Sequence, residues 1–298
     1  MAEQDAPLAP GLYLVATPIG NLNDITLRAL DVLRRADRIA CEDTRQTQKL
    51  LNHFQIATPT ESLHEHNERA RTSSVVAALQ AGARIAVVSD AGMPGISDPG
   101  MALTAAAIAA GIAVIPIPGA NAALSALVAS GLPTDEFQFL GFLPEKAGQR
   151  RTRIEALADA ADTAQTLIFY EAPHRILDTL ADLEAVFGAE LRIVVARELT
   201  KIHEEFLRGA VAEVRGEMAS RDRVRGEITL LVQAPARSEM ASNTNVAATI
   251  AQRVAQLQSE FAIDEKEALK RLARELNRSK SELYRELQRE HAASRKRP

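Results

Sequence analysis

The sequence contains no tryptophan, a single cysteine and few aromatic residues (4%). Because Cys41 has no partner, an intrachain disulfide is excluded, which fits a reducing compartment. The scarcity of aromatic rings argues against recognition of many bases by stacking. No uncharged apolar run reaches the length of about 18 residues that a transmembrane helix needs. The N-terminal residues also lack the pattern of a signal peptide. These absences predict a soluble, cytoplasmic protein.

Several nucleotide-binding and catalytic motifs are missing as well. No two glycines stand two residues apart, and no Gly-Lys dipeptide occurs, so the dinucleotide fingerprint and the Walker loop are excluded. The nucleophile elbow Gly-x-Ser-x-Gly is absent too. There is no Cys-x-x-Cys, and His64 and His66 would point in opposite directions on a strand. We therefore expect no metal site.

The chain has 298 residues, of which 46% are apolar and 25% charged, enough for two medium domains and a small appendage. A net charge of −4 gives no general argument for nucleic acid. The charge is unevenly distributed, since residues 264–298 contain 11 Lys and Arg against 7 Asp and Glu. A basic arm that binds a polyanion and a solvated helix with alternating charges both account for this excess.

Apolar runs alternate with helical patterns along the first 236 residues, which predicts a mainly parallel sheet with crossover connections. Asp24 is expected to cap the first helix. Residues 234–245 have the Pro, Ser and Asn content of a linker, and the pattern after them is helical. The expected strands are 12–16, 38–41, 85–88, 112–115, 166–170, 192–196 and 228–232. The expected helices are 25–36, 45–54, 68–81, 101–110, 120–130 and 174–186.

The segment Ser89–Gly100 follows the apolar run 85–88 and contains three glycines, two prolines and two aspartates. In open α/β sheets, ligands bind beyond the carboxyl ends of the strands, where this segment would lie. Glycine permits a positive φ and close backbone approach to a ligand. We favour ligand contact for Asp90 and Gly92, whereas helix capping explains Asp98 and Gly100 nearly as well.

A series of motifs, in order from Gly11 to Gln233, resembles the ribosomal RNA small subunit methyltransferase I family, which has the tetrapyrrole methylase fold. The chain departs from the family pattern at residues 93–95 and 120–121, beside the expected cofactor pocket. The matching segments are Leu14–Leu22 with Asp24–Thr26, Glu42–Arg45, His64–Asn67, Ser89–Gly100, Pro118–Gly119, Gly131–Pro133, Gly141–Pro144, Phe169–Glu171 with His174–Arg175, and Ala196–Lys201.

The resemblance implies an α/β, two-lobed tetrapyrrole methylase-like fold with parallel or mixed sheets and a small C-terminal helical module. We expect an N-terminal lobe at 10–120, a C-terminal lobe at 121–236 that completes a cofactor cleft, and a helical module at 246–298. The module resembles a helix-turn-helix, with a turn at 277–279. RNA docking or dimer packing is preferred to DNA reading as its role. Family membership also implies a homodimer. The expected core of the module is Leu269, Leu272, Ala273, Leu276, Leu283 and Leu287.

By the same resemblance, S-adenosylmethionine (SAM) binds in the cleft between the lobes. Its sulfonium is a fixed cation, which carbonyl-rich loops and carboxylates complement better than an apolar slot does. The first half would contribute Pro18, Ser89, Asp90, Gly92, Ile96, Ser97, Asp98, Asn121 and Ala122. The second half would contribute Tyr170, Ala196, Arg197, Glu198, Gly226, Glu227 and Ile228.

The family methylates a ribose 2′-hydroxyl, which implies a cytidine of 16S rRNA in the small ribosomal subunit as the acceptor. A hydroxyl is a weak acid, so a positioned base or a nearby cation would help it lose its proton. Arg45 or Lys201 could supply the cation, and Glu171 or His174 could take the proton. The choice among these candidates stays open, and residues 42–45 are equally well explained as a capped helix start.

The basic stretch 144–153 is predicted to hold phosphates of single-stranded rRNA through Lys146, Arg150, Arg151 and Arg153. A solvated loop is the competing interpretation.

Two other functions also remain open. One is methylation of a tetrapyrrole or another small acceptor, against which the basic stretch and basic tail argue. The other is an RNA-binding ribosome-assembly protein without catalysis, which SAM binding would distinguish.

Overall fold

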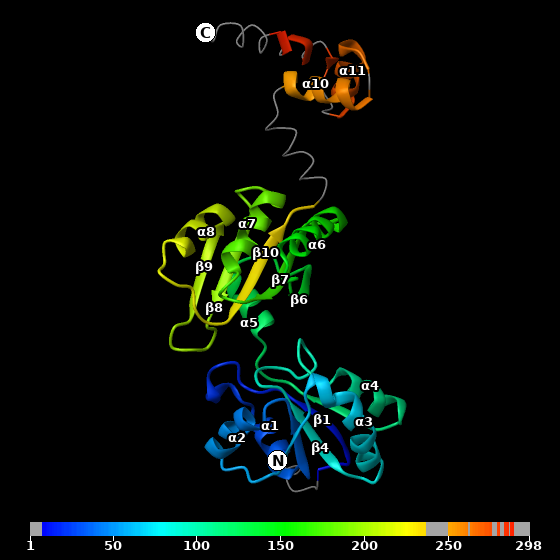
Figure 1. The fold of residues 1–298 in the computed structure, drawn as a ribbon, viewed down its shortest axis with the longest axis vertical. Helices are drawn as coiled ribbons and strands as arrows, with labels where there is room; N and C mark the ends of the chain where they lie inside the picture. Colours follow the sequence, from blue (N-terminus) through cyan, green and yellow to red (C-terminus); the bar gives the residue numbers. More distant parts are fainter. Residues whose placement is uncertain are drawn as a thin grey trace. The chain divides into compact units, whose positions relative to one another are not determined.

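The computed structural model describes residues 8–236, 250–261, 263–275, 279–280, 283–285 and 287–288. Two α/β lobes (Figure 1), each built on a five-stranded sheet, belong to one compact unit. The C-terminal helices form a second unit, which is described separately below. The predicted α/β class is confirmed. Within the described segments, no helix combines the length and apolar character needed to cross a membrane.

The sheet of the N-terminal lobe is entirely parallel, with strand order β3-β2-β4-β1-β5. Both faces are covered, because Leu12 enters one hydrophobic core while Tyr13 and Val15 enter the other. The strands are β1 (Gly11–Val15), β2 (Arg38–Cys41), β3 (Thr60–Ser62), β4 (Arg84–Val88) and β5 (Val114–Ile117). The helices are α1 (Leu27–Arg35), α2 (Thr44–His53), α3 (Glu65–Gln80) and α4 (Met101–Ala109).

Two local predictions in this lobe were wrong. Asp24 does not cap α1, because Leu22–Asp24 form a short 3-10 helix, η1, and Thr26 Oγ1 accepts the Ala29 N–H at 3.1 Å instead. The last strand begins two residues later than predicted. The N–H of Ile112 still donates to the Ala107 carbonyl at the end of α4, so the chain becomes extended only at Val114.

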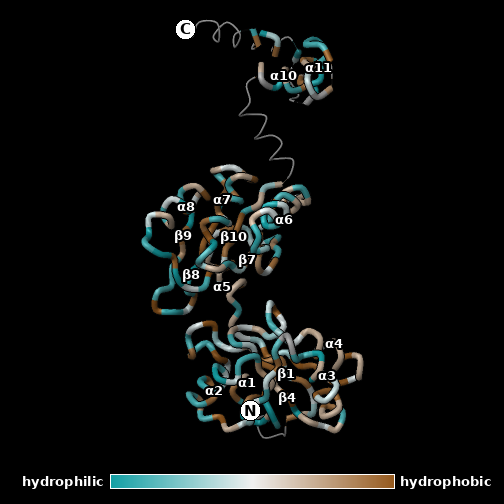
Figure 2. The backbone as a smooth tube through the Cα atoms, in the orientation of Figure 1, coloured by the Kyte–Doolittle hydropathy of each residue, from teal (hydrophilic) through white to brown (hydrophobic). Residues whose placement is uncertain are grey.

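The sheet of the C-terminal lobe is mixed, with order β6-β7-β10-β8-β9, and only β6 and β7 are parallel. Figure 2 shows hydrophobic residues along its central strand β10. The core on one face includes residues of α5, and the opposite core includes residues of the other three helices. The strands are β6 (Phe137–Phe142), β7 (Gln165–Glu171), β8 (Arg192–Arg197), β9 (Glu205–Ala210) and β10 (Ile228–Ala234). The helices are α5 (Ala122–Ser130), α6 (Ala147–Ala160), α7 (Ile176–Phe187) and α8 (Val211–Ala219).

The C-terminal unit contains α10 (Ile250–Phe261) and α11 (Glu265–Glu275). Its core includes the predicted residues Leu269, Leu272, Leu283 and Leu287, with Ala273 packed against it. Three residues of α10 that were not predicted, Ile250, Val254 and Leu257, complete this core. Leu276 and most of the predicted turn at 277–279 lie outside the described residues, as does the linker at 237–245.

Candidate functional site

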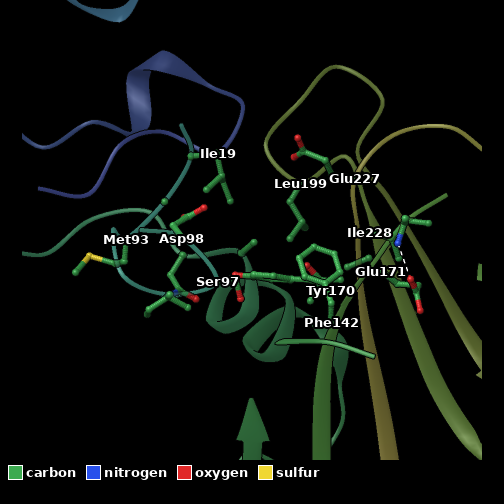
Figure 3. Close-up of a pocket in the computed structure, with 18 of the residues that line it drawn as sticks. Ile19, Met93, Ser97, Asp98, Phe142, Tyr170, Glu171, Leu199, Glu227 and Ile228 are labelled. Carbon is green, nitrogen blue, oxygen red and sulfur yellow. Dashed lines mark hydrogen bonds between the residues drawn. The ribbon is translucent and has the colours of Figure 1, made fainter. Parts of the chain in front are cut away.

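A cavity of about 380 Å³, here called the main cavity, is lined by residues from both α/β lobes (Figure 3). Its walls contain the loop after β4, the start of α5 and the ends of strands of the C-terminal sheet. The lining residues are Ile19, Ala91, Gly92, Met93, Ile96, Ser97, Asp98, Asn121, Ala122, Phe142, Tyr170, Glu171, Ala172, Pro173, Ala196, Leu199, Glu227, Ile228 and Thr229.

The loop Ser89–Gly100 is fixed at both ends. Near its start, the backbone of Gly92 exchanges two hydrogen bonds with Thr17, of 2.9 and 3.1 Å. At its end, buried Glu68 caps α4, since its Oε1 accepts the N–H groups of Gly100 (3.1 Å) and Leu103 (3.0 Å). Glu68 was not singled out in the sequence. Because it takes the capping role, the Asp98 side chain lines the main cavity instead.

Asp98 is the acidic group of the main cavity whose ionisation is most perturbed. Burial raises the pKa of Asp98 to about 6, and the carboxylate of Glu42 contributes to the increase. No cationic side chain of the described residues forms an ion pair with Asp98. A half-buried carboxyl without a cationic partner is suited to a positively charged ligand.

Aromatic rings form part of the wall contributed by the C-terminal lobe. The Tyr170 ring packs edge-on against Phe139 and Phe142, with centroid distances of 4.9 and 5.7 Å. Burial raises the pKa of the Tyr170 phenol, and Asp98 contributes to the increase. At the start of α5, Asn121 Oδ1 accepts the N–H of Leu124 at 3.0 Å, so Asn121 caps that helix. The wall therefore combines flat apolar surface with a few fixed polar groups.

A second cavity of about 300 Å³, here called the side cavity, adjoins the main cavity. The two cavities share three lining residues, Ile19, Ala91 and Glu227. The side cavity contains side chains of both charges, two lysines and two carboxylates. It is lined by Thr17, Pro18, Ile19, Gly20, Leu22, Gln46, Thr47, Lys49, Leu50, Ser89, Asp90, Ala91, Lys201 and Glu227.

Lys201 is held between two carboxylates at the side cavity. Its Nζ donates to Glu198 Oε1 at 2.8 Å and to Glu227 Oε2 at 3.0 Å. Burial acts to lower the pKa of Lys201, but the two carboxylates outweigh it and the pKa is raised. The hydrogen bond from Lys201 holds the pKa of Glu198 below its usual value. The ammonium is therefore fixed and charged. An added Cβ at Gly20 would collide with its side chain, so only glycine permits this approach.

The predicted cofactor residues fall into three groups. The largest group lines the main cavity: Gly92, Ile96, Ser97, Asp98, Asn121, Ala122, Tyr170, Ala196, Glu227 and Ile228. A second group lines the side cavity: Pro18, Ser89 and Asp90. Neither cavity is lined by Arg197, Glu198 or Gly226. Arg197 pairs with Glu205 at 2.9 Å, and Glu198 acts by holding Lys201.

The structure does not leave Glu171 free to accept a proton. Its carboxylate is buried, forms an ion pair with Arg175 and accepts hydrogen bonds from Ala172 N–H and Thr179 Oγ1, both at 2.7 Å. In Figure 3 the Glu171 carboxylate points away from Asp98. His174 is exposed and lines neither cavity, and the same holds for Arg45. Of the four catalytic candidates, only Lys201 lines a cavity and has an N–H group left to donate, since two of the three N–H groups on its Nζ are used by Glu198 and Glu227.

The predicted RNA-binding stretch is a helix rather than a loop. α6 begins at Ala147, and Arg150 lies on its inner face. Arg150 is 3% exposed and pairs with Asp182 at 2.7 Å, so its guanidinium cannot reach a phosphate. Arg150 therefore holds α6 in place and is not a phosphate contact. Lys146, Arg151 and Arg153 are exposed, although Arg151 also pairs with Glu155 at 3.1 Å.

Some lining residues were missed because their side chains are apolar and carry no chemical signal of their own. Several lie beside residues that were predicted, for example Leu199 after Glu198 and Thr229 after Ile228. Phe142 lies in the segment Gly141–Pro144, which was identified as a motif but given no role. The missed residues are Ile19, Phe142, Ala172, Pro173, Leu199 and Thr229, whereas Ala91 and Met93 belong to the Ser89–Gly100 segment that was expected to bind a ligand.

Comparisons with known proteins agree with the geometry. The sequence profile of the tetrapyrrole (corrin/porphyrin) methylases matches residues 11–215. A ribosomal RNA small subunit methyltransferase I from Halalkalibacterium halodurans is 56% identical over 222 residues, 74% of this chain and 75% of that protein. One from Bacillus subtilis is 44% identical over 275 residues, 92% of each chain. In fold, the chain is similar to a uroporphyrin-III-C-methyltransferase from Thermus thermophilus, with a TM-score of 0.53 and 20% identity over 80% of this chain and 98% of the other.

Proposed function

This chain belongs to the tetrapyrrole (corrin/porphyrin) methylase family, and on that premise we propose that it transfers a methyl group from SAM to a ribose 2′-hydroxyl of small-subunit ribosomal RNA. The acceptor proposed is a cytidine of 16S rRNA. A substrate of this kind would place the protein in the cytoplasm. Two relatives that are 44% and 56% identical carry the name of an rRNA methyltransferase, which supports rRNA as the acceptor.

The donor assignment depends most on the main cavity and on Asp98. The volume of about 380 Å³ is in the range of small-molecule sites. The half-buried Asp98 carboxyl suits the fixed positive charge of a sulfonium, and the Tyr170 wall offers a flat apolar surface to an adenine. When bound, SAM would supply an electrophilic methyl group. The protein would bind it, orient it and limit the access of water.

A small-molecule acceptor such as a tetrapyrrole is not favoured. The likeness to the uroporphyrin methyltransferase is only 20% in identity and shows a shared fold. The much closer relatives are named for ribosomal RNA. A non-catalytic RNA-binding role is also less well supported, because a cavity of this kind has no evident use in a protein that only binds RNA.

Methyl transfer from radiolabelled SAM tests the proposal. Purified chain would be incubated with labelled SAM and, in parallel, with small ribosomal subunits that lack the modification, free 16S rRNA and a porphyrinogen. We expect label in rRNA, at one cytidine, in a form that resists alkaline hydrolysis because the 2′-oxygen is blocked. Label in the porphyrinogen alone, or on a base instead of a ribose, would refute the proposal.

We also propose that two copies associate. Apolar side chains on α4 and α5 are exposed in the single chain, including Met101 (75%) and Val128 (78%), and exposed apolar patches often mark interfaces. Sedimentation velocity at micromolar concentration measures the association directly. A species of twice the chain mass is expected, and a monomer throughout the concentration range would contradict this proposal.

A further inference from the structure

The junction between the two cavities contains a single ionisable group. Of the described residues, Ile19, Ala91 and Glu227 line both cavities, and only Glu227 carries a charge. The Glu227 side chain is 76% exposed, so its carboxylate is accessible from the cavities. Figure 3 shows Ile19 and Glu227 on opposite sides of the main cavity, from different lobes. The Glu227 carboxylate is therefore accessible to a ligand that lies at the junction.

The side cavity has the size and polarity for one nucleotide. Its volume of about 300 Å³ is at the lower end of small-ligand sites, which fits a single nucleotide rather than a macrocycle. Gln46 and Lys49, both from α2, are joined by a hydrogen bond from Lys49 Nζ to Gln46 Oε1 at 2.7 Å. The amide N–H groups of Gln46 and the other ammonium N–H groups of Lys49 can donate to a base or a phosphate. Lys201 has three N–H donors, of which two are used by Glu198 and Glu227. The third is available to a ligand.

We propose that the side cavity receives the acceptor nucleotide, extruded from its RNA strand, and that Glu227 is the catalytic residue that accepts the proton of its 2′-hydroxyl. The inference rests on the proposed function, because it takes the main cavity as the donor site. With the donor there, an in-line approach requires the reacting oxygen to lie at the junction, beside Glu227. Enzymes that act on a base extrude the nucleotide from the stack, and a side cavity of single-nucleotide size suits the same arrangement here.

In the step that follows, the 2′-oxygen forms a bond to the methyl carbon while the carbon–sulfur bond breaks. The bonding electron pair goes to sulfur, which becomes a neutral thioether. The hydroxyl proton passes to a carboxylate oxygen of Glu227 and then to water. Lys201 stabilises negative charge that develops on the 2′-oxygen before the new bond is complete.

Other carboxylates near the cavities are less well placed. Glu171 is buried and fully bonded, as described above. Glu198 accepts from both Lys201 Nζ and the Glu227 N–H through one oxygen and lines neither cavity. Asp90 lines the side cavity but not the junction, and Asp98 lines only the main cavity. Glu227 is thus the carboxylate that an oxygen at the junction would meet.

Glu227→Gln tests the proton-acceptor role under single-turnover conditions, with saturating SAM and rRNA. We expect the methyl-transfer rate to fall by at least ~100-fold, the scale of general-base catalysis. The pH dependence of the rate should differ between wild type and variant, because only the wild type has a carboxylate at the junction that can take the proton. SAM affinity measured by calorimetry should change by less than about threefold. Glu227→Asp should retain part of the rate, and Glu190→Gln, at an exposed turn, is the matched control.

Three results would overturn the proton-acceptor role while leaving the proposed function intact. They are a Glu227→Gln rate within threefold of the wild type, a reduced rate with an unchanged pH profile, and a loss of SAM affinity large enough to account for the reduced rate. If the wild-type chain binds SAM but transfers no methyl group to rRNA, the proposed function fails and this inference fails with it.

The nucleotide site has a readout that does not depend on activity. Replacement of Gln46 and Lys49 by alanine should weaken the binding of an rRNA fragment at least fivefold in a fluorescence titration while leaving SAM affinity unchanged. Both side chains are exposed on α2, so the fold should be unaffected, and circular dichroism checks this. Unchanged RNA affinity, or a loss of SAM affinity instead, would contradict the assignment of the side cavity.

Discussion

At the scale of single residues, Asp98 connects the electrostatics of the main cavity with its proposed ligand. Its pKa is raised to about 6 because burial disfavours the charged form. A bound cation would favour that charged form. The Asp98 carboxyl should therefore lower the folding stability of the ligand-free protein and raise its affinity for a cationic ligand.

Asp98→Asn should weaken the binding of SAM more than that of S-adenosylhomocysteine, which lacks the sulfonium charge. The expected loss is on the order of tenfold for SAM, the scale of one charge-assisted interaction. In the wild type, SAM affinity should decrease as the pH falls through about 6, because Asp98 becomes protonated. Calorimetric titrations of both ligands at pH 5 and pH 8 measure these effects. Equal losses for the two ligands would show that Asp98 does not sense the sulfonium.

The same substitution should stabilise the ligand-free protein at neutral pH. The folded-state pKa of Asp98 is raised from 3.8 to about 6, so the folded protein binds more protons than the unfolded chain in that window. Its contribution to stability therefore decreases as the pH rises through the window. After allowance for solvent at the cavity, Asp98→Asn should gain ~1 kcal/mol at pH 7, or ~2–4 °C in Tm. Thermal unfolding at pH 7 and pH 4 checks this, and an equal gain at both values would contradict it.

The residues that define the site could be predicted only in part. The loop Ser89–Gly100 could be found because glycine, proline and aspartate after a buried strand leave few structural alternatives. The bonding of the Glu171 carboxylate could not be predicted, because its partners Arg175 and Thr179 are brought back to the strand end only by the start of α7. Glu68 could not be predicted either, since it caps α4 from a different helix.

At the scale of elements, Glu205 links β9 to the rest of the C-terminal lobe. Its carboxylate accepts from Arg197 at 2.9 Å and, through two bonds of 2.8 Å, from Arg221. The hydrogen bonds from Arg221 are the main reason that the pKa of Glu205 is lowered to about 2. The sequence did not predict β9, because Leu207 is its only buried apolar side chain and the alternation is weak. The ion pairs of Glu205 with Arg197 and Arg221 partly compensate for the small apolar area that β9 buries.

Glu205→Gln should destabilise the protein at pH 7 by ~1–2 kcal/mol, after allowance for partial exposure. The folded pKa of about 2 lies below the ordinary 4.5, so the stabilisation is present above pH 4.5 and is lost as the pH falls toward 2. Urea unfolding of wild type and variant at pH 7 and pH 3 tests this. The difference in unfolding free energy should shrink at pH 3, and a constant difference would argue against an electrostatic origin.

Substitutions in the basic helix α6 should distinguish an arginine with a structural role from arginines that contact RNA. Arg150→Ala removes a buried side chain and leaves Asp182, which is 19% exposed, without its partner. The change should cost ~2–3 kcal/mol, less than the ~3–5 kcal/mol of a fully buried pair. Arg151→Ala with Arg153→Ala should leave the Tm unchanged and lower the salt slope of RNA binding by ~1.4, for two lost phosphate contacts on a single strand. RNA titrations over a range of KCl concentrations measure this slope. A Tm loss in the double variant, or an unchanged slope, would contradict the assignment.

Elements were more predictable than their ends and roles. The buried strands β4, β7, β8 and β10 were identified because continuous apolar runs require burial on both faces. The helix α6 was interpreted as a polar stretch, because its first large apolar residue is Ile154, directly after the last of its three arginines. Pairing between strands of the mixed sheet is a long-range property that a local pattern does not encode.

At the scale of the whole molecule, both cavities lie within the unit that contains the two α/β lobes. The C-terminal unit has a hydrophobic core of its own, and the last 35 residues carry a positive net charge. The C-terminal unit is therefore expected to contribute to RNA binding but not to donor binding.

A chain that ends at residue 236 should bind SAM with unchanged affinity and bind rRNA about tenfold more weakly at 0.1 M salt, because long-range phosphate attraction is lost. Calorimetry with SAM and a filter-binding titration with 16S rRNA measure the two affinities. If the shortened chain binds RNA as well as the full chain does, the C-terminal module has a role other than RNA docking.

The central claim is that the main cavity holds the methyl donor and presents its methyl group to a nucleotide in the side cavity. A crystal structure of the chain with S-adenosylhomocysteine and a short rRNA fragment tests it most directly. We expect the sulfur near the junction at Glu227, on the side toward Ile19, and a cytidine in the side cavity with its 2′-oxygen beside that carboxylate. A nucleotide phosphate seated in the main cavity, or a donor bound outside it, would contradict the account.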